Sequence, residues 1–202
     1  VGIRVEYPWI NDMTHMPLMG SAGFDLYVVK NGVHTYKGSF RPPCETREEC
    51  SYESVVKFED DSMRDIVINF PLYNGVNSLY VCLQEEAVLE SGEKYRYDKP
   101  VLYYGSSITQ GGCASRPGCS YESLISQKYD TDFINLGFSG NAKGEDNMMD
   151  YIASLDMSAF VYDYDHNSQT YQFLEKTHEA GYKKIREGNP TVPIIMITFS
   201  GP

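Results

Sequence analysis

The stretch VLYYGSSITQGG, from Val101 to Gly112, decides how the second half of the chain is interpreted. An apolar run stops at Gly105, two serines follow, and a polar, glycine-rich turn comes next. This order is typical of a buried strand that turns sharply into a helix and leaves a hydroxyl group at the carboxyl end of the strand. Ligands of open α/β sheets bind beyond those strand ends. The stretch therefore predicts that Ser106 or Ser107 faces a binding site.

Downstream of Gly112, apolar runs alternate with segments of helical periodicity. The runs lack the polar alternation of half-exposed strands, which indicates a parallel sheet with helices on both faces. The expected strands span residues 101–105, 132–138, 159–165 and 192–199, and the expected helices span residues 120–129, 144–155 and 168–188. The pattern predicts an α/β domain over residues 99–202.

Upstream of residue 98, short strand-like runs are separated by turn residues, and none keeps a helical period for long. The Asn74-Gly75 pair suits a tight hairpin, because both central residues of such a turn need positive φ. We therefore expect residues 1–98 to form an accessory antiparallel β-sandwich, similar to a jelly roll. The polar segment 91–100 is interpreted as the link to the α/β domain.

The loops after the first three expected strands of the α/β domain carry different hydrogen-bonding groups. The first, GSSITQGG, offers serine hydroxyls, the second, GFSGNAKGE, offers glycine N–H groups, and the third, DYDHNSQT, offers the amide of Asn167. Acyl transfer needs an exposed nucleophile and N–H donors around the place where the tetrahedral oxyanion forms. Gly140 lets a backbone N–H approach closely because it has no Cβ, and asparagine supplies an uncharged donor. Together the loops predict a serine nucleophile with an oxyanion hole.

These three blocks, in this order, resemble those of the SGNH (GDSL-type) hydrolases, which are serine esterases and lipases with a flavodoxin-like sheet. The resemblance places the nucleophile at Ser107, with Ser106 in place of the usual aspartate, and oxyanion donors at Gly140 and Asn167. The third block is degenerate, because Asn167 lacks the glycine and the aspartate that flank it in the family pattern. Upstream, GFDLY (Gly23–Tyr27) and the later FPLYNGV resemble the β-domain that precedes a subset of bacterial SGNH esterases.

The resemblance implies a histidine base in a D-x-x-H block after a fifth strand, and this sequence shows no such block at its carboxyl end. Asp163 and His166 have the same spacing, but they lie in the third block, so we interpret this match as coincidence. His178 is expected to be a partly buried packing residue, and His15 and His34 belong to the β-domain. We therefore expect the chain to lack the C-terminal part of the hydrolase domain, with its catalytic histidine and aspartate, and to have little or no esterase activity by itself.

Composition argues against several other functions. The net charge is −11 and the basic residues are scattered, so nucleic acid is not an expected partner. No apolar run is long enough to span a membrane, and no signal peptide is visible; a cleaved signal leaves no trace, so cytoplasmic and secreted locations both stay open. Cys44 with Cys50, and Cys113 with Cys119, have spacings that suit small disulfide loops, although five reduced thiols are the preferred interpretation. Neither a metal nor a cofactor is expected.

The expected substrate is a carbohydrate ester or another small ester, because relatives with the accessory β-domain resemble carbohydrate-ester deacetylases. Two alternatives stay open. The β-domain of a non-catalytic protein could bind carbohydrate, or a flavodoxin-like domain could bind a nucleotide, since a hydroxyl-rich loop also suits phosphate. The apolar strand at 192–199 has no covering element after it, and such an edge invites pairing with another chain. Homo-oligomerisation through this strand is therefore also left open.

Overall fold

The computed structural model describes residues 1–198, which cluster into two compact units. Unit 1 comprises Val1–Lys94 and Gly112–Asp130, and unit 2 comprises Tyr95–Gly111 and the residues from Thr131 onward. The first boundary lies close to the expected one at residue 98. The segment Gly112–Asp130, however, belongs to unit 1 although it lies within the stretch assigned to the α/β domain. Within the described part of the chain, no helix has both the length and the apolar character needed to cross a bilayer.

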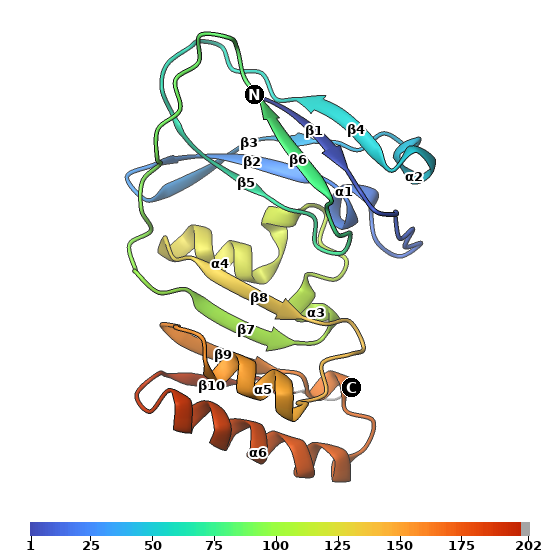
Figure 1. The fold of residues 1–202 in the computed structure, drawn as a ribbon, viewed down its shortest axis with the longest axis vertical. Coiled ribbons are helices and arrows are strands. Elements are labelled where there is room, and N and C mark those ends of the chain that lie inside the picture. Colours follow the sequence, from blue (N-terminus) through green and yellow to red (C-terminus); the bar gives the residue numbers. More distant parts are fainter. Residues whose placement is uncertain (199–202) are drawn as a thin grey trace. The chain divides into compact units, whose positions relative to one another are not determined.

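Unit 1 contains two antiparallel sheets of three strands each, in the orders β4-β1-β6 and β3-β2-β5 (Figure 1). The strands are β1 (Gly2–Glu6), β2 (Phe24–Lys30), β3 (Val33–Phe40), β4 (Ser51–Val55), β5 (Asp65–Asn69) and β6 (Ser78–Cys82). The helical elements of the unit are α1 (Leu18–Ser21), α2 (Thr46–Glu49), the 3-10 turn η1 (Pro117–Cys119) and α4 (Tyr121–Tyr129). Alternate residues of β1 and β2, such as Val5 and Leu26, are fully buried in one apolar core. The expected antiparallel β-structure is therefore present.

The tight hairpin of unit 1 lies at Asn31-Gly32 and not at Asn74-Gly75. Asn31 and Gly32 have φ of 53° and 72°, and they join β2 to β3. The hairpin prediction for Asn74-Gly75 is wrong, because β5 pairs with β2 whereas β6 pairs with β1. Asn74 is buried, and its side chain accepts from the Asn11 N–H at 2.7 Å and donates to the Ser21 carbonyl at 2.9 Å. These tertiary hydrogen bonds, and not turn formation, explain why asparagine occupies position 74.

Unit 2 is built on a parallel sheet with the strand order β10-β9-β7-β8 (Figure 1). The strands are β7 (Val101–Gly105), β8 (Phe133–Gly137), β9 (Ala159–Asp163) and β10 (Ile194–Met196). The helical elements are α3 (Ser107–Gln110) after β7, α5 (Asp146–Ala153) after β8, and the 3-10 turn η2 (Asp165–Asn167) and α6 (Tyr171–Gly188) after β9. Antiparallel sheets followed by a parallel sheet with helices confirm the predicted fold class.

The core of unit 2 lies between one face of the sheet and helices α5 and α6. Its fully buried residues include Tyr104 from β7, Tyr162 from β9, Ile152 from α5 and Ile185 from α6. The rings of Tyr104 and Tyr162 have their centroids 6.1 Å apart. Several of the chain's tyrosines therefore serve packing in this unit.

Strand β10 is at the edge of the parallel sheet. Ile195 and Met196 are 52% and 44% exposed there. The expected strand extended to residue 199, which lies outside the described residues. Pairing of this edge with another chain stays a prediction.

Candidate active site

The carboxyl ends of three neighbouring strands are aligned at one edge of the parallel sheet. Gly105, the last residue of β7, is in register with Gly137 of β8 on one side and with Asp163 of β9 on the other. The loops that start at these three positions carry the site residues predicted from the sequence. Parallel pairing therefore brings together segments that are far apart in the chain.

The first loop distinguishes the two serines. Ser106 is the N-cap of α3: it is 1% exposed, and its Oγ accepts from the Ile108 N–H at 3.2 Å. Its own N–H donates to the Asp163 carbonyl at 3.1 Å. Ser107 is the first residue of α3 and is partly exposed. A buried hydroxyl that caps a helix is poorly placed to attack a substrate, so Ser107 is the serine that this turn presents.

The turn between β7 and α3 is tight because glycines allow the backbones to approach. A Cβ on Gly105 would overlap Thr109 Oγ1, and it would lie 2.5 Å from the Asp163 carbonyl oxygen. A Cβ on Gly137 would overlap the backbone nitrogen of Gln110. Both positions therefore need glycine for the short helix to sit against the strand ends.

Side-chain hydrogen bonds connect both β8 and the loop that follows it to α3. The Asn135 amide donates to the Thr109 carbonyl at 2.7 Å, which satisfies a carbonyl at the end of the helix. The Gln110 side chain accepts from the Ser139 N–H at 2.8 Å. Gly140, the next residue, has φ of +68°, and no atom lies within 4 Å of a Cβ placed there. Positive φ, rather than the close approach expected from the sequence, is what favours glycine at this position.

The third loop meets the second through Asn167, in η2. Its Nδ2 donates to the Phe138 carbonyl at 3.0 Å, and the same carbonyl accepts from the backbone N–H of Asn141 at 3.0 Å. A side-chain amide has two N–H groups, and this bond uses one of them to orient Asn167. Ser107, Gly140 and Asn167 thus lie on three loops that hydrogen bonds join.

Asp163 is an ionisable group at this site to which the sequence pattern assigned no function. Its side chain is 3% exposed, and its Oδ2 accepts from Thr109 Oγ1 at 3.0 Å. Burial raises the pKa of Asp163, and the hydrogen bond from Thr109 opposes that rise. An acidic residue at the end of an apolar strand was the available sequence signal. Its contacts connect β9 directly to α3.

The histidines of unit 2 differ in environment. His178 stacks on Tyr162 with 4.7 Å between ring centroids, and burial lowers its pKa. His166 is exposed and follows Asp163 at the D-x-x-H spacing. In unit 1 the same spacing occurs at Asp12 and His15. There the Asp12 carboxylate accepts from Arg47 Nε at 2.9 Å.

The other histidine of unit 1, His34, is paired with an acidic residue, and the cysteines form no disulfide in the described part of the chain. His34 Nε2 lies 3.3 Å from the Asp130 carboxylate. All five cysteines are free thiols, including the two pairs with loop-forming spacings.

Comparison with known proteins identifies the family to which the chain belongs. The profile of the GDSL-like lipase/acylhydrolase family matches residues 98–200. The chain belongs to the GDSL-like lipase/acylhydrolase family. The resemblance seen in the sequence blocks is thereby confirmed. A second profile, GxDLY, the N-terminus of SGNH-hydrolase-type esterases, matches residues 1–89.

Solved structures agree with the family. One described as a GDSL-like lipase from Bacteroides ovatus ATCC 8483 is 27% identical, with a TM-score of 0.87, over 96% of this chain and 56% of that chain. The salicylyl-acyltransferase SsfX3 from a tetracycline biosynthetic pathway is 16% identical, with a TM-score of 0.68, over 96% of this chain and 53% of that one. The chain thus spans a little over half the length of these structures, and the second shares its fold. No curated protein matches the chain.

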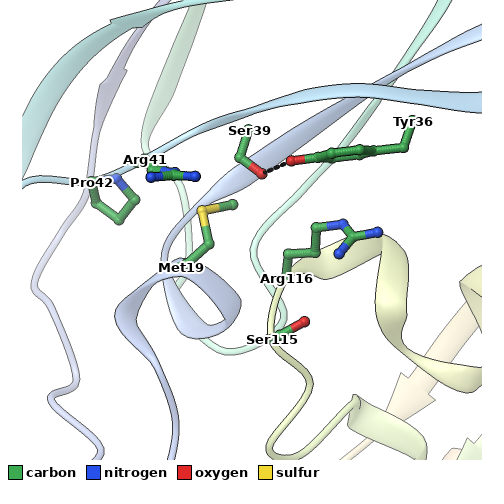
Figure 2. Close-up of a pocket in the computed structure, with 7 residues that line it drawn as sticks. All are labelled: Met19, Tyr36, Ser39, Arg41, Pro42, Ser115 and Arg116. Atoms are coloured by element: carbon green, nitrogen blue, oxygen red, sulfur yellow. Dashed lines mark hydrogen bonds between the residues drawn. The ribbon is translucent and has the colours of Figure 1, made fainter.

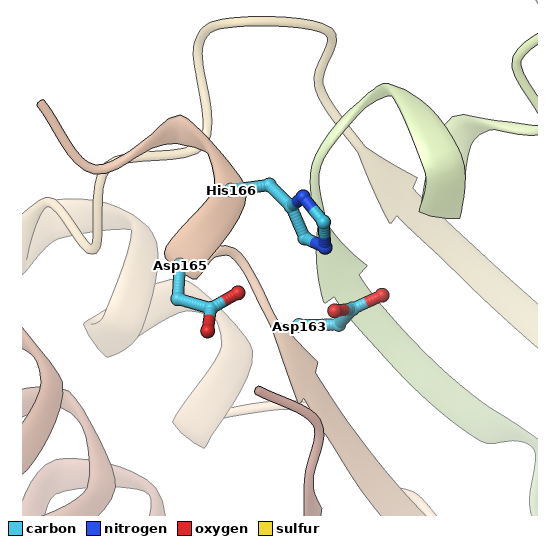
Figure 3. A group of neighbouring side chains, drawn as sticks. All are labelled: Asp163, Asp165 and His166. Atoms are coloured by element: carbon cyan, nitrogen blue, oxygen red, sulfur yellow. The ribbon is translucent and has the colours of Figure 1, made fainter. Parts of the chain in front are cut away.

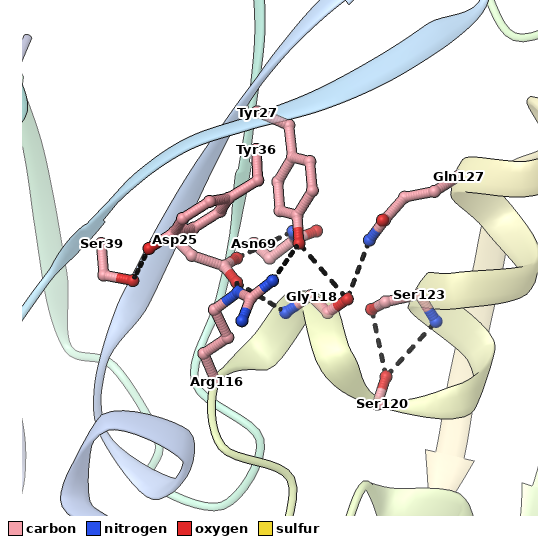
Figure 4. A network of polar contacts seen from close by, with 10 residues as sticks. All are labelled: Asp25, Tyr27, Tyr36, Ser39, Asn69, Arg116, Gly118, Ser120, Ser123 and Gln127. Atoms are coloured by element: carbon pink, nitrogen blue, oxygen red, sulfur yellow. Dashed lines mark hydrogen bonds and ion pairs between the residues drawn. The ribbon is translucent and has the colours of Figure 1, made fainter.

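The GxDLY segment of this GDSL-like protein has a clear structural purpose in unit 1 (Figure 4). Asp25 is fully buried on β2; it accepts from the Gly118 N–H at 2.9 Å and the Asn69 amide at 2.9 Å, and it pairs with Arg116 Nε at 3.3 Å. The Tyr27 hydroxyl donates to the Gly118 carbonyl at 3.4 Å. The signature therefore binds the η1 turn of the Gly112–Asp130 segment to the β-sheet.

A pocket of about 400 Å³ lies next to this network in unit 1 (Figure 2). Two guanidinium groups, two serine hydroxyls and a tyrosine contribute to its lining. The lining residues are Met19, Tyr36, Ser39, Arg41, Pro42, Ser115 and Arg116. Arg116 also lies over the Tyr36 ring, with its guanidinium carbon 4.3 Å from the ring centroid. In the family member described here, the pocket therefore combines two guanidinium groups with apolar side chains.

Proposed function

We propose that this chain carries the nucleophile and the oxyanion hole of a serine ester hydrolase. The observation that carries the proposal is the alignment of the three strand ends, with Ser106 capping α3 so that Ser107 is the serine presented. In the proposed reaction, Ser107 Oγ attacks the ester carbonyl. The backbone N–H groups of Ser107 and Gly140 and the Asn167 amide stabilise the oxyanion.

The proposed reaction has two balanced steps. In the first, the Ser107 Oγ bonds to the acyl carbon, its proton passes to a base, and the alcohol leaves with a proton from that base. In the second, water attacks the acyl-enzyme, the base takes a proton from the water, and the acid leaves as Ser107 is regenerated. We propose that this base and its orienting aspartate come from residues outside this chain, as in the D-x-x-H block of the family.

The structure provides a serine-specific test of this proposal. Hydrolysis of p-nitrophenyl acetate is measured for the wild-type chain and for Ser107→Ala and Ser106→Ala. We expect a slow wild-type rate, because enzymes stripped of a triad member keep only about 10³–10⁴-fold catalysis over water. That residual rate comes from the oxyanion hole and substrate binding, so Ser107→Ala should change it little in this chain. In the full-length gene product, Ser107→Ala should lower the rate to this residual level. Ser106→Ala should keep most of the full-length rate while unfolding about 1 kcal/mol more easily, since it loses a helix cap.

Two results would count against the proposal. A rate of the full-length gene product that survives Ser107→Ala would show that Ser107 is not the nucleophile. A chain that hydrolyses the ester as fast as the full-length gene product, and depends on Ser107 for it, would place the base within these residues. His166→Ala then identifies or excludes the nearest histidine in the third loop.

The proposed substrate is a short-chain ester of a carbohydrate or another small polar alcohol. The match of residues 1–89 to the GxDLY profile supports this proposal, because relatives with that N-terminal unit resemble carbohydrate-ester deacetylases. The full-length gene product should release acetate from acetylated xylo-oligosaccharides more efficiently, in kcat/KM, than it hydrolyses p-nitrophenyl decanoate. A preference for the decanoate would refute this assignment without affecting the role of Ser107.

A further inference from the structure

Three side chains with metal-binding donor atoms converge where β9 ends and η2 begins (Figure 3). One ligand atom from each of Asp163, Asp165 and His166 lies within 4.8 Å of the others. Asp163 and Asp165 share one side of the chain because Tyr164 between them points into the core, where it is 1% exposed. The local backbone therefore places two carboxylates and an imidazole around one point.

The Asp163 carboxylate has an unusual hydrogen-bonding state. Its Oδ2 accepts from Thr109, whereas its Oδ1 is buried and has no hydrogen-bond partner among the residues that the structure describes. Buried polar atoms of folded proteins are almost always satisfied, and a carboxylate oxygen without a partner is among the most costly exceptions. In Figure 3 this carboxylate faces the His166 ring and lies beside Asp165. A ligand in the space that the three side chains surround would supply this carboxylate with a further partner.

A cation fits this space better than a proton. Protonation of Asp163 would remove its charge, but it would still leave a second carboxylate, Asp165, close by. A divalent cation would bind Oδ1 and compensate both carboxylates at once. The exposed His166 leaves a path by which such an ion can enter from solvent.

We propose that Asp163, Asp165 and His166 bind a divalent cation of the first transition row, with Mn²⁺ as its representative. Two carboxylate oxygens and one imidazole nitrogen form a mixed donor set that Mn²⁺ accepts, whereas Mg²⁺ and Ca²⁺ favour ligands made only of oxygen. Water completes the coordination. The ion would hold η2 in place, and with it Asn167, whose amide bonds the Phe138 carbonyl.

The test is a titration of the 202-residue chain with MnCl₂, followed by calorimetry and by the electron paramagnetic resonance signal of free Mn²⁺. Mn²⁺ is the appropriate probe because the five free cysteines would bind Zn²⁺ elsewhere. We expect one bound ion per chain. Even loss of a residue that only orients a ligand weakens metal sites by about 10–100-fold, so Asp163→Asn and His166→Ala should each weaken binding by at least tenfold.

The matched control is the other D-x-x-H pair, since Asp12 and His15 are both exposed in unit 1. Asp12→Asn and His15→Ala should leave Mn²⁺ affinity unchanged. The proposal is overturned if the chain binds no Mn²⁺ at millimolar concentration, or if binding survives His166→Ala. Because His166 is exposed, its removal leaves the core intact and decides the matter even if Asp163→Asn fails to fold. The readout is metal binding, so it does not depend on esterase activity or on Ser107.

Discussion

The buried ion pair between Asp25 and Arg116 leads to a quantitative prediction for Asp25→Ala. The Asp25 side chain is fully buried, whereas that of Arg116 is 29% exposed. Removing the carboxylate leaves the Gly118 N–H and the Asn69 amide without their acceptor. Arg116 keeps access to water, so the loss of its ion-pair partner destabilises the fold less than the loss of the two hydrogen bonds does.

The magnitude follows from the two donors that lose their acceptor. A buried donor without a partner costs about 1–3 kcal/mol, so Asp25→Ala should lower the free energy of unfolding by about 2–5 kcal/mol. With a urea m-value of about 2 kcal/mol/M, the middle of the usual range, the midpoint of unfolding should fall by roughly 1–2.5 M. Circular dichroism in urea measures this shift, and an unchanged m-value shows that the unfolded state is not altered.

The chain contains its own control for this experiment. Asp12 accepts from Arg47 Nε at 2.9 Å, but the Asp12 side chain is 56% exposed. Asp12→Ala should therefore leave the unfolding midpoint within experimental error of wild type. If Asp25→Ala and Asp12→Ala shift the midpoint equally, then burial of Asp25 does not set the cost and the reasoning is refuted.

Three further predictions concern pH, steric fit and turn geometry. Burial raises the pKa of Asp25 in the folded chain above its ordinary 3.8. The folded chain therefore binds this proton more tightly than the unfolded chain does. As a result, the contribution of Asp25 to the free energy of unfolding falls as the pH rises from 3.8 through the raised pKa. The stability of wild type relative to Asp25→Asn should decline over that window in urea titrations, and a constant difference would contradict the shift. Gly137→Ala should cost about 1–3 kcal/mol of stability and reduce ester hydrolysis, because its Cβ overlaps the Gln110 backbone; unchanged stability and rate would argue against this packing. Gly32→Ala should cost roughly 1–2 kcal/mol because φ is +72°, whereas Gly75→Ala, which has open space at its Cβ, should be neutral; equal effects in thermal melts would place the hairpin elsewhere.

The parallel sheet and the loops that follow its strands could be predicted from local patterns. A run such as VLYYG that ends at glycine and serine marks both the strand and its carboxyl end. Parallel strands then place their ends at one edge, so the order of the loops was enough to group Ser107, Gly140 and Asn167. The choice between Ser106 and Ser107 came from the family resemblance. The structure adds a physical reason, which is the capping bond of Ser106.

The hairpin could not be located from local sequence, because two Asn-Gly pairs have equal turn chemistry. Asn31 adopts the turn, whereas Asn74 is used for tertiary hydrogen bonds to Ser21 and Asn11. Such partners are distant in the sequence and leave no local pattern. The pairing of Arg116 with Asp25 could not be predicted from local sequence either. The only sequence signal was an acidic residue, Asp25, within an apolar strand, which indicates that a cation must lie close to Asp25.

The segment Gly112–Asp130 has a consequence for the order in which the chain folds. It follows α3 in sequence, yet its residues Arg116 and Gly118 are partners of Asp25 in unit 1. During synthesis, the β-sheet unit cannot be completed until residue 130 has left the ribosome, by which time the residues of β7 and α3 of the other unit have already been synthesised. A fragment that stops at residue 98 would expose a buried carboxylate on β2. Exchange of this unit between relatives would therefore require two separate pieces of the gene to move together.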